Sequence, residues 1–324
     1  MTRIFAEAYG CSANFADYEA AMGLLSEAGF QLTENPKDSD LLMVFTCVVK
    51  TPTERKMIRR IRELQASGKP LVVAGCLPKA EEALIIEMAP KASLMGPNSM
   101  LQVVDVVEET LKGVKVQALE DMLVPKTCLP RARLNPVIHI APISSGCLGD
   151  CSYCIVKLAR GRLFSYPLEA IMEDASKAVS SGAKEVWVTS QDTAAYNSNG
   201  ARLPDLLEAL CAIEGKFYLR VGMMTPNTAL SILDDLVIVF KKDKVFKFLH
   251  LPVQSGNDEI LKKMNRRYET NDFKHIVTRF REEIPEVTVS TDIICGFPSE
   301  TGEQFKDSLR LVDEVKPDVV NISR

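Results

Sequence analysis

The sequence predicts an α/β protein with two units, each built on a parallel sheet. Two observations support this fold class. Short apolar runs rich in β-branched residues alternate with helical stretches along almost the whole chain, and this alternation favours parallel strands covered by helices. A chain of 324 residues is also long enough to form two such units.

The first alternation occupies residues 1–115. Strands are expected at 3–9, 41–45, 70–74 and 93–95, and helices at 17–28, 53–66 and 79–88. Residues 116–135 contain Pro125 and Pro130 but no clear period, and are expected to be a linker.

The second alternation occupies residues 136–324 and predicts an open, partial (β/α)6 barrel. Its six strands are expected at 137–143, 185–190, 217–223, 245–251, 288–295 and 319–322. Because a covering helix should follow the sixth strand, we expect a barrel truncated at its C-terminal end.

Composition favours an ordinary globular protein in a reducing compartment. Hydrophobic residues make up 46% of the chain, and the net charge of −4 argues against a nucleic-acid-binding surface over the whole molecule. Nine cysteines show no pattern of a small secreted domain, which favours ligand roles over disulfides. No apolar run approaches 18 residues and no signal peptide is apparent, so a cytoplasmic protein without a membrane partner is expected.

Three cysteines, Cys147, Cys151 and Cys154, lie within eight residues directly after the first barrel strand. Loops at strand ends are where α/β sheets and barrels place their chemistry. Three thiolates are one short of a closed zinc site and one short of the usual 4Fe-4S ligand set. The pattern favours a cluster with one iron open to a non-protein ligand, against zinc with a distant fourth ligand or thiols that only pack.

A second set of cysteines is spread through the first unit. Cys11, Cys47 and Cys76 each follow a predicted strand within a turn. Because the ends of parallel strands lie on one side of a sheet, these thiols are expected to converge as a second three-thiolate site. The alternative is three separate structural cysteines.

The spacing C-x-x-x-C-x-x-C, with Tyr153 before its last cysteine, resembles the signature of radical S-adenosylmethionine (SAM) enzymes. The resemblance implies that Cys147, Cys151 and Cys154 hold a 4Fe-4S cluster whose open iron is chelated by SAM. One electron then cleaves SAM into methionine and a 5′-deoxyadenosyl radical.

Over nearly its whole length the chain resembles the methylthiotransferases, and most closely their archaeal and eukaryotic branch. The matching runs are Tyr9-Gly10-Cys11 with Asn14, Thr46-Cys47, Ala74-Gly75-Cys76, Ala159-Arg160-Gly161-Arg162, Thr189-Ser190-Gln191-Asp192-Thr193, Arg220-Val221-Gly222-Met223, His250-Leu251-Pro252-Val253-Gln254-Ser255-Gly256 and Asp292-Ile293-Ile294-Cys295-Gly296-Phe297-Pro298. Two positions depart from the family pattern: Phe45 replaces the usual Asn, and Ser299 replaces the usual Gly.

The resemblance implies an enzyme that adds a methylthio group to C2 of N6-threonylcarbamoyladenosine at position 37 of tRNA. Cys11, Cys47 and Cys76 would hold an auxiliary 4Fe-4S cluster, and two SAM molecules would supply the methyl group and the radical. The implied substrate is the anticodon stem-loop of tRNA, and the reaction needs an electron donor that the sequence does not identify. Relatives continue into a small RNA-binding domain, which we expect to be absent here, and the oligomeric state is not predicted.

Contacts to SAM are expected from the ends of the barrel strands. The candidates are Tyr153, Ser190, Gln191, Asp192, Gln254 and Gly296. The alternative for each is that it satisfies a backbone group at a strand end.

Several charged and polar residues have ordinary interpretations. The basic runs at 55–62 and 262–267 are expected to be solvated faces, while Lys157, Arg160 and Arg162 could contact substrate or cofactor. His139 and His250 are expected to be hydrogen-bonded within the fold.

Two further functions remain open: modification of a ribosomal protein by the same chemistry, and a non-catalytic iron–sulfur or zinc protein.

Overall fold

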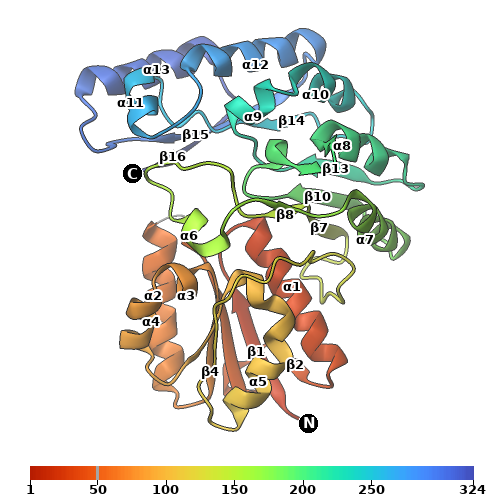
Figure 1. Cartoon of the computed structure of the whole chain (residues 1–324), viewed down its shortest axis with the longest axis vertical. Helices are drawn as coiled ribbons and strands as arrows, with labels where there is room; N and C mark the ends of the chain where they lie inside the picture. The colour runs from red at the N-terminus through yellow and green to blue at the C-terminus, as the bar shows by residue number, and fades with distance from the viewer. Residues whose placement is uncertain (49–50) are drawn as a thin grey trace. The chain divides into compact units, whose positions relative to one another are not determined.

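The computed structural model describes residues 1–48 and 51–324. The chain divides into two compact units (Figure 1). The first comprises Met1–Asn135 together with Ile155–Phe164, and the second comprises Pro136–Cys154 together with Ser165–Arg324.

The first unit is built on a six-stranded, wholly parallel sheet in the order β2-β1-β3-β4-β5-β6. Its strands are β1 (Arg3–Ala8), β2 (Gln31–Thr33), β3 (Leu41–Thr46), β4 (Leu71–Gly75), β5 (Ser93–Met95) and β6 (Gln117–Ala118). The two central strands, β3 and β4, are buried along their whole length. A continuous apolar run is typical of parallel strands that are covered on both faces.

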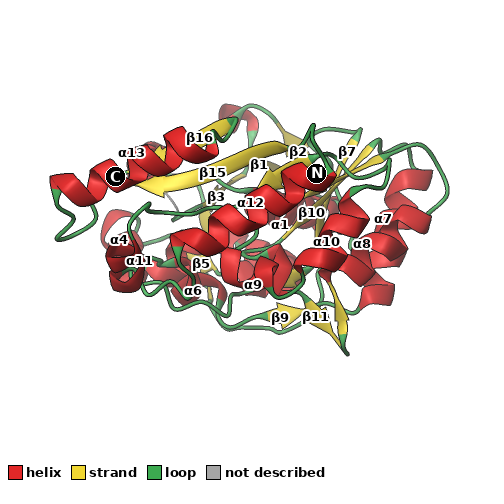
Figure 2. Ribbon diagram, turned by 90° about the horizontal axis from the view of Figure 1, so that it is seen from above, coloured by secondary structure: helices red, strands yellow, loops and turns green. Residues whose placement is uncertain are grey.

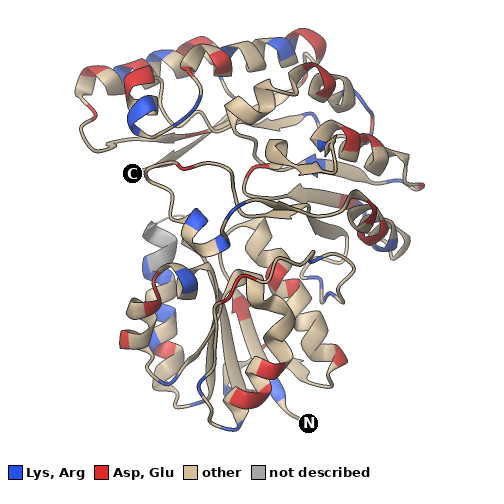
Figure 3. Cartoon of the chain, in the orientation of Figure 1, with Lys and Arg blue, Asp and Glu red and all other residues tan. Residues whose placement is uncertain are grey.

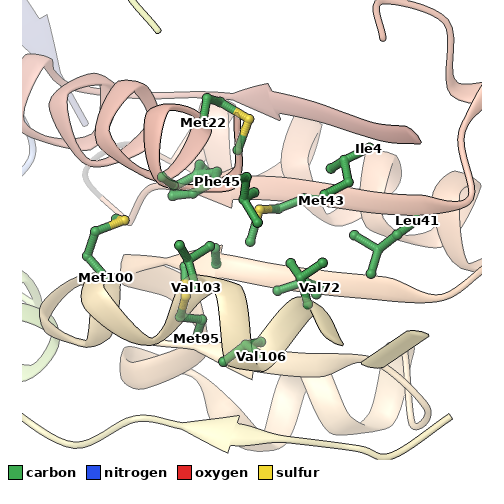
Figure 4. Packing of buried hydrophobic residues seen from close by; sticks show 14 of the residues in the cluster. Ile4, Met22, Leu41, Met43, Phe45, Val72, Met95, Met100, Val103 and Val106 are labelled. Carbon is green, nitrogen blue, oxygen red and sulfur yellow. The ribbon is translucent and has the colours of Figure 1, made fainter. Parts of the chain in front are cut away.

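Helices cover both faces of this sheet. They are α1 (Ser12–Glu27), α2 (Thr51–Ala66), α3 (Cys76–Ala80), α4 (Glu82–Met88), α5 (Val103–Leu111) and α6 (Val156–Arg160), with 3-10 turns η1 (Pro36–Asp38) and η2 (Pro97–Gln102). One core lies between the sheet and helices α1 and α5, where Met22, Phe45 and Val103 pack together (Figure 4). The other lies on the opposite face, under α2, α3 and α4.

The register of this sheet brings three strand ends to one level. Ala8 pairs with Phe45 across β1 and β3, and Thr46 pairs with Gly75 across β3 and β4. Each of these strands then enters a turn that carries a cysteine.

Residues 116–135, expected to be a linker, instead pack on the first unit. β6 adds the sixth strand of the sheet, and Leu129 and Ala132 pack against the core beneath α1. Gly23 of α1 approaches this segment so closely that a Cβ there would lie 2.1 Å from the carbonyl oxygen of Pro130. The sequence signal failed because apolar side chains spaced irregularly along an extended segment produce no helix or strand period.

The second unit contains six parallel strands in chain order. They form two three-stranded groups, β13-β10-β7 and β14-β15-β16, joined by a parallel bridge between Leu219 and Val245. The strands are β7 (Ile138–Pro142), β10 (Glu185–Thr189), β13 (Tyr218–Val221), β14 (Phe248–His250), β15 (Thr288–Ile294) and β16 (Val319–Ser323). This is the order expected for the open barrel.

Helices alternate with these strands along the chain (Figure 2). They are α7 (Leu168–Ser180), α8 (Leu203–Ala212), α9 (Pro226–Leu230), α10 (Leu233–Phe240), α11 (Asp258–Lys263), α12 (Thr270–Glu283) and α13 (Gly302–Val315). Short elements complete the chain: β8 (Ser144–Ser145), β9 (Phe164–Ser165), η3 (Thr193–Ala195), β11 (Asn197–Ser198) and β12 (Ala201–Arg202). Over residues 1–48 and 51–324, no helix combines the length and apolar character needed to cross a membrane.

Candidate metal centres

The structure brings the thiols of Cys11, Cys47 and Cys76 together at the carboxyl ends of β1, β3 and β4. Cys11 and Cys47 form a hydrogen bond that lowers the pKa of Cys11 to about 6. Cys76 lies close enough to interact electrostatically with Cys11, and burial raises the pKa of its thiol. Cys47 and Cys76 are buried whereas Cys11 is exposed, so the trio has one open side.

Two glycines make this convergence possible. Gly10 has φ +112°, and a Cβ there would lie 2.3 Å from the Cβ of Cys47. Gly75 has φ +91°, and a Cβ there would lie 2.5 Å from the carbonyl oxygen of Thr46. Both positions combine a left-handed backbone with a close approach, which only glycine accommodates without strain.

Thr46 and Asn14 hold the turns that carry the cysteines. The Thr46 hydroxyl donates to the carbonyl oxygen of Ala74 at 2.6 Å and accepts from the backbone N–H of Leu77 at 3.3 Å. The Asn14 amide donates to the carbonyl oxygen of Tyr9 at 2.7 Å. The Thr46 bonds tie the end of β3 to the end of β4, and the Asn14 bond closes the turn after β1, which explains the value of Thr before Cys47 and of Asn after Cys11.

A buried charge network beside this trio was not identified from the sequence. The Asp17 carboxylate accepts from Lys126 Nζ and from Arg160 Nη2, each at 2.8 Å. Arg160 in turn lies close enough to Cys76 to interact electrostatically with its thiol. Nothing in the spacing links residues 17, 126 and 160, although Arg160 belongs to a run already suspected of contacting substrate or cofactor.

The second unit brings together the thiols of Cys147, Cys151 and Cys154. Both Cys147 Sγ and Cys151 Sγ lie within 3.6 Å of the position that a Cβ on Gly149 would occupy, and the backbone N–H of Gly149 donates to Cys147 Sγ at 3.2 Å. Burial raises the pKa of Cys147, and the neighbouring Cys151 and Cys154 act in the same direction. Cys154 is exposed, so this trio also has an open side.

Two segments of the barrel anchor the cysteine loop. Gln191 Oε1, after β10, accepts from the backbone N–H of Gly146 at 2.8 Å. After α11, the carbonyl oxygen of Met264 accepts from the backbone N–H of Ser152 at 3.0 Å, and the Asn265 amide donates to the carbonyl oxygen of Asp150 at 2.8 Å. The loop is therefore held at both ends by backbone-directed bonds.

Arg266 is a further site residue that the sequence did not single out. Its Nη1 donates to Cys151 Sγ at 3.1 Å, and its Nε donates to the hydroxyl of Tyr268 at 2.8 Å. Burial lowers the pKa of Arg266, but Tyr268, Tyr153 and Cys151 outweigh it and raise the pKa. In the sequence, Arg266 belongs to a basic run whose other members, Lys262, Lys263 and Arg267, are exposed. The charge pattern alone does not show that Arg266 is the member that contacts a cysteine.

The residue type of both trios, cysteine, matches the ligands of an iron–sulfur cluster, although in the described part of the chain the side chains are not arranged around a single metal-ion position. Thiolates are the ordinary ligands of such clusters, and each trio leaves an open side next to its exposed cysteine. Across the described part of the chain, no group of three His, Cys, Asp or Glu side chains is arranged as a site for a metal ion.

Comparison with known proteins identifies the family. Residues 141–312 match the model of the radical SAM superfamily, and residues 3–96 match that of an uncharacterized protein family, UPF0004. The chain is 43% identical to the probable threonylcarbamoyladenosine tRNA methylthiotransferase of Pyrococcus horikoshii, over 100% of this chain and 77% of that protein. The chain belongs to the threonylcarbamoyladenosine tRNA methylthiotransferase family. This confirms the family predicted from the sequence.

Other relatives extend the comparison. The threonylcarbamoyladenosine tRNA methylthiotransferase of Homo sapiens is 39% identical over 98% of this chain and 56% of its own length. Among solved structures, the radical SAM methyltransferase TsrM from Kitasatospora setae covers 100% of this chain with a TM-score of 0.69 at 14% identity, and 73% of that chain is matched. The structural likeness supports the two-unit α/β fold.

The residues expected to contact SAM in this methylthiotransferase have different surroundings. Gln191 holds the cysteine loop, as described above, and Ser190 Oγ accepts from the backbone N–H of Asp192 at 3.1 Å. The Asp192 carboxylate accepts from the Thr225 backbone N–H at 3.0 Å and from the Thr228 hydroxyl at 2.9 Å. Burial raises the pKa of Asp192. Each of these three side chains therefore accepts a hydrogen bond from a backbone N–H group, which was the alternative to a contact with SAM. A contact with SAM by any of them stays a prediction.

The remaining expected contacts lie on the same unit. Gln254 has φ +70° and forms a parallel bridge with Ile293 of β15. Gly296 follows the end of β15 with φ +74°, and its backbone N–H donates to Glu300 Oε2 at 2.7 Å. Tyr153, inside the cysteine loop, is 36% exposed. SAM contacts by these residues also stay predictions.

Of the two departures from the family pattern, the structure explains Phe45 but gives no reason for Ser299. Phe45 is fully buried and packs edge-on against Tyr18, with ring centroids 5.5 Å apart, so an aromatic ring fills the core there (Figure 4). Ser299 has φ +69°, a conformation that glycine adopts more readily, and its hydroxyl accepts from Lys263 Nζ at 3.0 Å.

The basic run on α2 forms a mostly solvated face. Figure 3 shows Lys and Arg along this helix. Arg59 pairs with Glu63 at 3.6 Å, and Arg60 pairs with Glu7 at 2.7 Å. The histidines are also hydrogen-bonded within the fold as expected, His139 with Asp174 and His250 with Asp292, each at 3.0 Å.

Proposed function

We propose that this chain replaces the hydrogen on C2 of N6-threonylcarbamoyladenosine, at position 37 of tRNA, with a methylthio group. One observation carries the proposal: each of the two parallel-sheet units brings three thiols together at strand ends and leaves one of them exposed. The names of the relatives support the choice of nucleoside.

Each trio has a separate task. Cys147, Cys151 and Cys154 hold the 4Fe-4S cluster that binds SAM, and Cys11, Cys47 and Cys76 hold an auxiliary 4Fe-4S cluster. When bound, one SAM would supply the methyl group, a second would supply the radical that takes the C2 hydrogen, and the auxiliary cluster would carry the sulfide that receives the methyl group. Radical chemistry suits this carbon because its C–H bond is too weakly acidic for a general base at neutral pH.

The barrel residues keep the cysteine loop in position. Gln191 holds the backbone at Gly146, and Arg266 donates to Cys151 Sγ. Arg266 also supplies positive charge beside thiols that lose their protons when they bind iron. This charge lowers the cost of holding negative thiolates in a partly buried loop. Both residues therefore act as positioning residues for the loop.

SAM contacts complete the site. In this proposal Tyr153 lies near the adenine, and the strand-end residues Gln254 and Gly296 face the cofactor. Ser190 and Asp192 sit beside Gln191 at the end of β10, where the carboxylate could also receive the methionyl ammonium. Asp192 is buried and keeps two hydrogen bonds to the start of α9, so its geometry is fixed before any cofactor binds.

The substrate is expected to be the anticodon stem-loop of a tRNA in the cytoplasm. Phosphate contacts would come from local basic side chains rather than from net charge, which is −4 for the whole chain. Exposed members of the basic runs, such as Arg55, Arg62 and Arg267, are available for such contacts.

Two measurements on the anaerobically reconstituted chain test the proposal. Iron analysis should give about eight irons per chain, and about four would contradict the two-cluster arrangement. Incubation with SAM, dithionite and tRNA carrying N6-threonylcarbamoyladenosine, followed by nucleoside mass spectrometry, should show the 2-methylthio derivative. Formation of 5′-deoxyadenosine with a modified ribosomal protein instead of modified tRNA would overturn the assigned substrate.

A further inference from the structure

Three charged side chains form a buried network beneath the N-terminal cysteine trio. Arg160, Asp17 and Lys126 are 3%, 3% and 4% exposed. They come from three distant parts of the chain: Asp17 from α1, Lys126 from the segment between β6 and β7, and Arg160 from the last position of α6. All three belong to the first unit.

Asp17 alone cannot balance both cations. Its two oxygens accept one bond each, from Lys126 Nζ and Arg160 Nη2 at 2.8 Å. Lys126 has a second acceptor in the carbonyl oxygen of Pro97 at 2.6 Å. Burying a guanidinium is costly unless it is paired and hydrogen-bonded, and arginine does not escape the cost by losing its proton.

The other side of Arg160 faces thiols. α6 packs against α3, whose first residue is Cys76, and Ala159 shares a core cluster with Cys76 and Leu77. Arg160 lies within electrostatic reach of the thiols of Cys76 and Cys11. Asp17 thus holds the guanidinium of Arg160 from one side. On the other side, the groups that can carry a negative charge are the thiols of Cys76 and Cys11.

We propose that Arg160 is a positioning residue of the auxiliary cluster, held by Asp17 so that its guanidinium donates to ligating sulfur and stabilises the more negative, reduced form. The inference rests on the proposed function, because it assumes a cluster at Cys11, Cys47 and Cys76. Net charge and hydrogen bonds to sulfur are among the factors that set the potential of an iron–sulfur cluster. One-electron reduction adds one negative charge to the cluster, so a fixed cation nearby raises the reduction potential.

The test isolates one cluster in the 324-residue chain. Replacing Cys147, Cys151 and Cys154 together by Ala leaves only the N-terminal trio to bind iron. After anaerobic reconstitution, iron analysis should give about four irons per chain. The reduction potential of this cluster is then measured by titration followed by electron paramagnetic resonance.

Substitutions in this background change the charge in opposite directions. Arg160→Gln removes the cation and should make the potential more negative, and Arg160→Lys should cause a smaller shift of the same sign. Asp17→Asn removes the anion and should make the potential less negative. Arg60→Gln is the matched control, because Arg60 pairs with Glu7 at 2.7 Å in the same unit and should leave the potential unchanged.

The outcomes separate this inference from the proposed function. Absence of iron in the parent background overturns the auxiliary cluster and the inference with it. A bound cluster whose potential is the same in Arg160→Gln and the parent overturns the inference alone. Should Arg160→Gln fail to fold, the other two variants decide, because a purely structural role predicts no opposite shifts for Arg160→Lys and Asp17→Asn.

Discussion

The two cysteine trios reach a similar arrangement by different routes. In the barrel, Cys147, Cys151 and Cys154 lie in one loop, and a few bonds from neighbouring segments hold that loop. In the first unit, residues 11, 47 and 76 come from three turns and meet because the register of a parallel sheet brings those turns to one level.

The difference shows where each site is vulnerable. A local loop can relax around a small change, because its cysteines are close in sequence. The N-terminal trio depends on three strand ends, on two glycines in left-handed conformations and on a buried charge network. Changes in the turns of the first unit should therefore cost more than equivalent changes in the barrel loop.

The largest expected effect separates the chemical tasks of the two trios. Cys151→Ala should abolish formation of 5′-deoxyadenosine, because in the proposed function it removes a ligand of the SAM-binding cluster. Cys47→Ala should still form 5′-deoxyadenosine while the methylthio product falls to background. Both products can be followed by mass spectrometry in one assay. Loss of 5′-deoxyadenosine in Cys47→Ala, with the protein still folded, would contradict the division of tasks.

A pair of glycine substitutions compares the two sites directly. Gly10→Ala should lower the free energy of unfolding by about 2–4 kcal/mol, because its Cβ would lie 2.3 Å from Cys47 Cβ on a backbone with φ +112°. Gly149→Ala is the control and should cost ~0.5 kcal/mol, because its Cβ would meet the two sulfurs at ordinary contact distance. Denaturant titration of both variants measures the difference, and equal costs would contradict the comparison.

Removing a single hydroxyl tests the bond that ties β3 to β4. Thr46→Val keeps the shape of the side chain but leaves the Ala74 carbonyl oxygen and the Leu77 N–H without their partner. The expected loss is about 1–3 kcal/mol of unfolding free energy, because both groups are buried. Thr46→Ser restores the hydroxyl and should recover most of it. If the urea concentration at the midpoint of unfolding were unchanged in Thr46→Val, the two hydrogen bonds would make no net contribution to stability.

The smallest expected effect is a pH dependence in the first unit. Glu19 is 2% exposed; its Oε1 accepts from the Leu134 N–H at 3.0 Å, while Oε2 has no hydrogen-bond partner among the described residues. Burial raises the pKa of Glu19. The folded state therefore holds this proton more tightly, and stability falls as the pH rises from the ordinary value of 4.5 through the raised pKa.

Glu19→Gln should remove that dependence. We expect the variant to be more stable than the parent at pH 7 by less than about 1 kcal/mol, and to differ little below pH 4, where the parent carboxyl is protonated. Thermal unfolding at several pH values measures this. A larger benefit at low pH than at pH 7 would reverse the sign and contradict the argument.

Much of the architecture could be predicted because it depends on local pattern. The six barrel strands were expected from their β-branched runs, and β5 (Ser93–Met95) has the predicted bounds. The secondary structure after β5 was not predicted: α5 (Val103–Leu111) and β6 (Gln117–Ala118) lie where the sequence analysis assigned no element. β6 is two residues long and is stabilised by pairing with β5, which no window of sequence reveals.

The sequence by itself determined the family, the positions of both sets of cysteines and the alternation that makes each sheet parallel. All of these depend on residue types at short spacing, which a linear chain displays directly. Only the tertiary structure decided that Arg266 lies beside Cys151, and that Lys126 and Arg160 share Asp17 beneath the other trio. Those contacts join residues 109 to 143 positions apart, and their energy arises from burial and fixed geometry that exist only once the chain has folded.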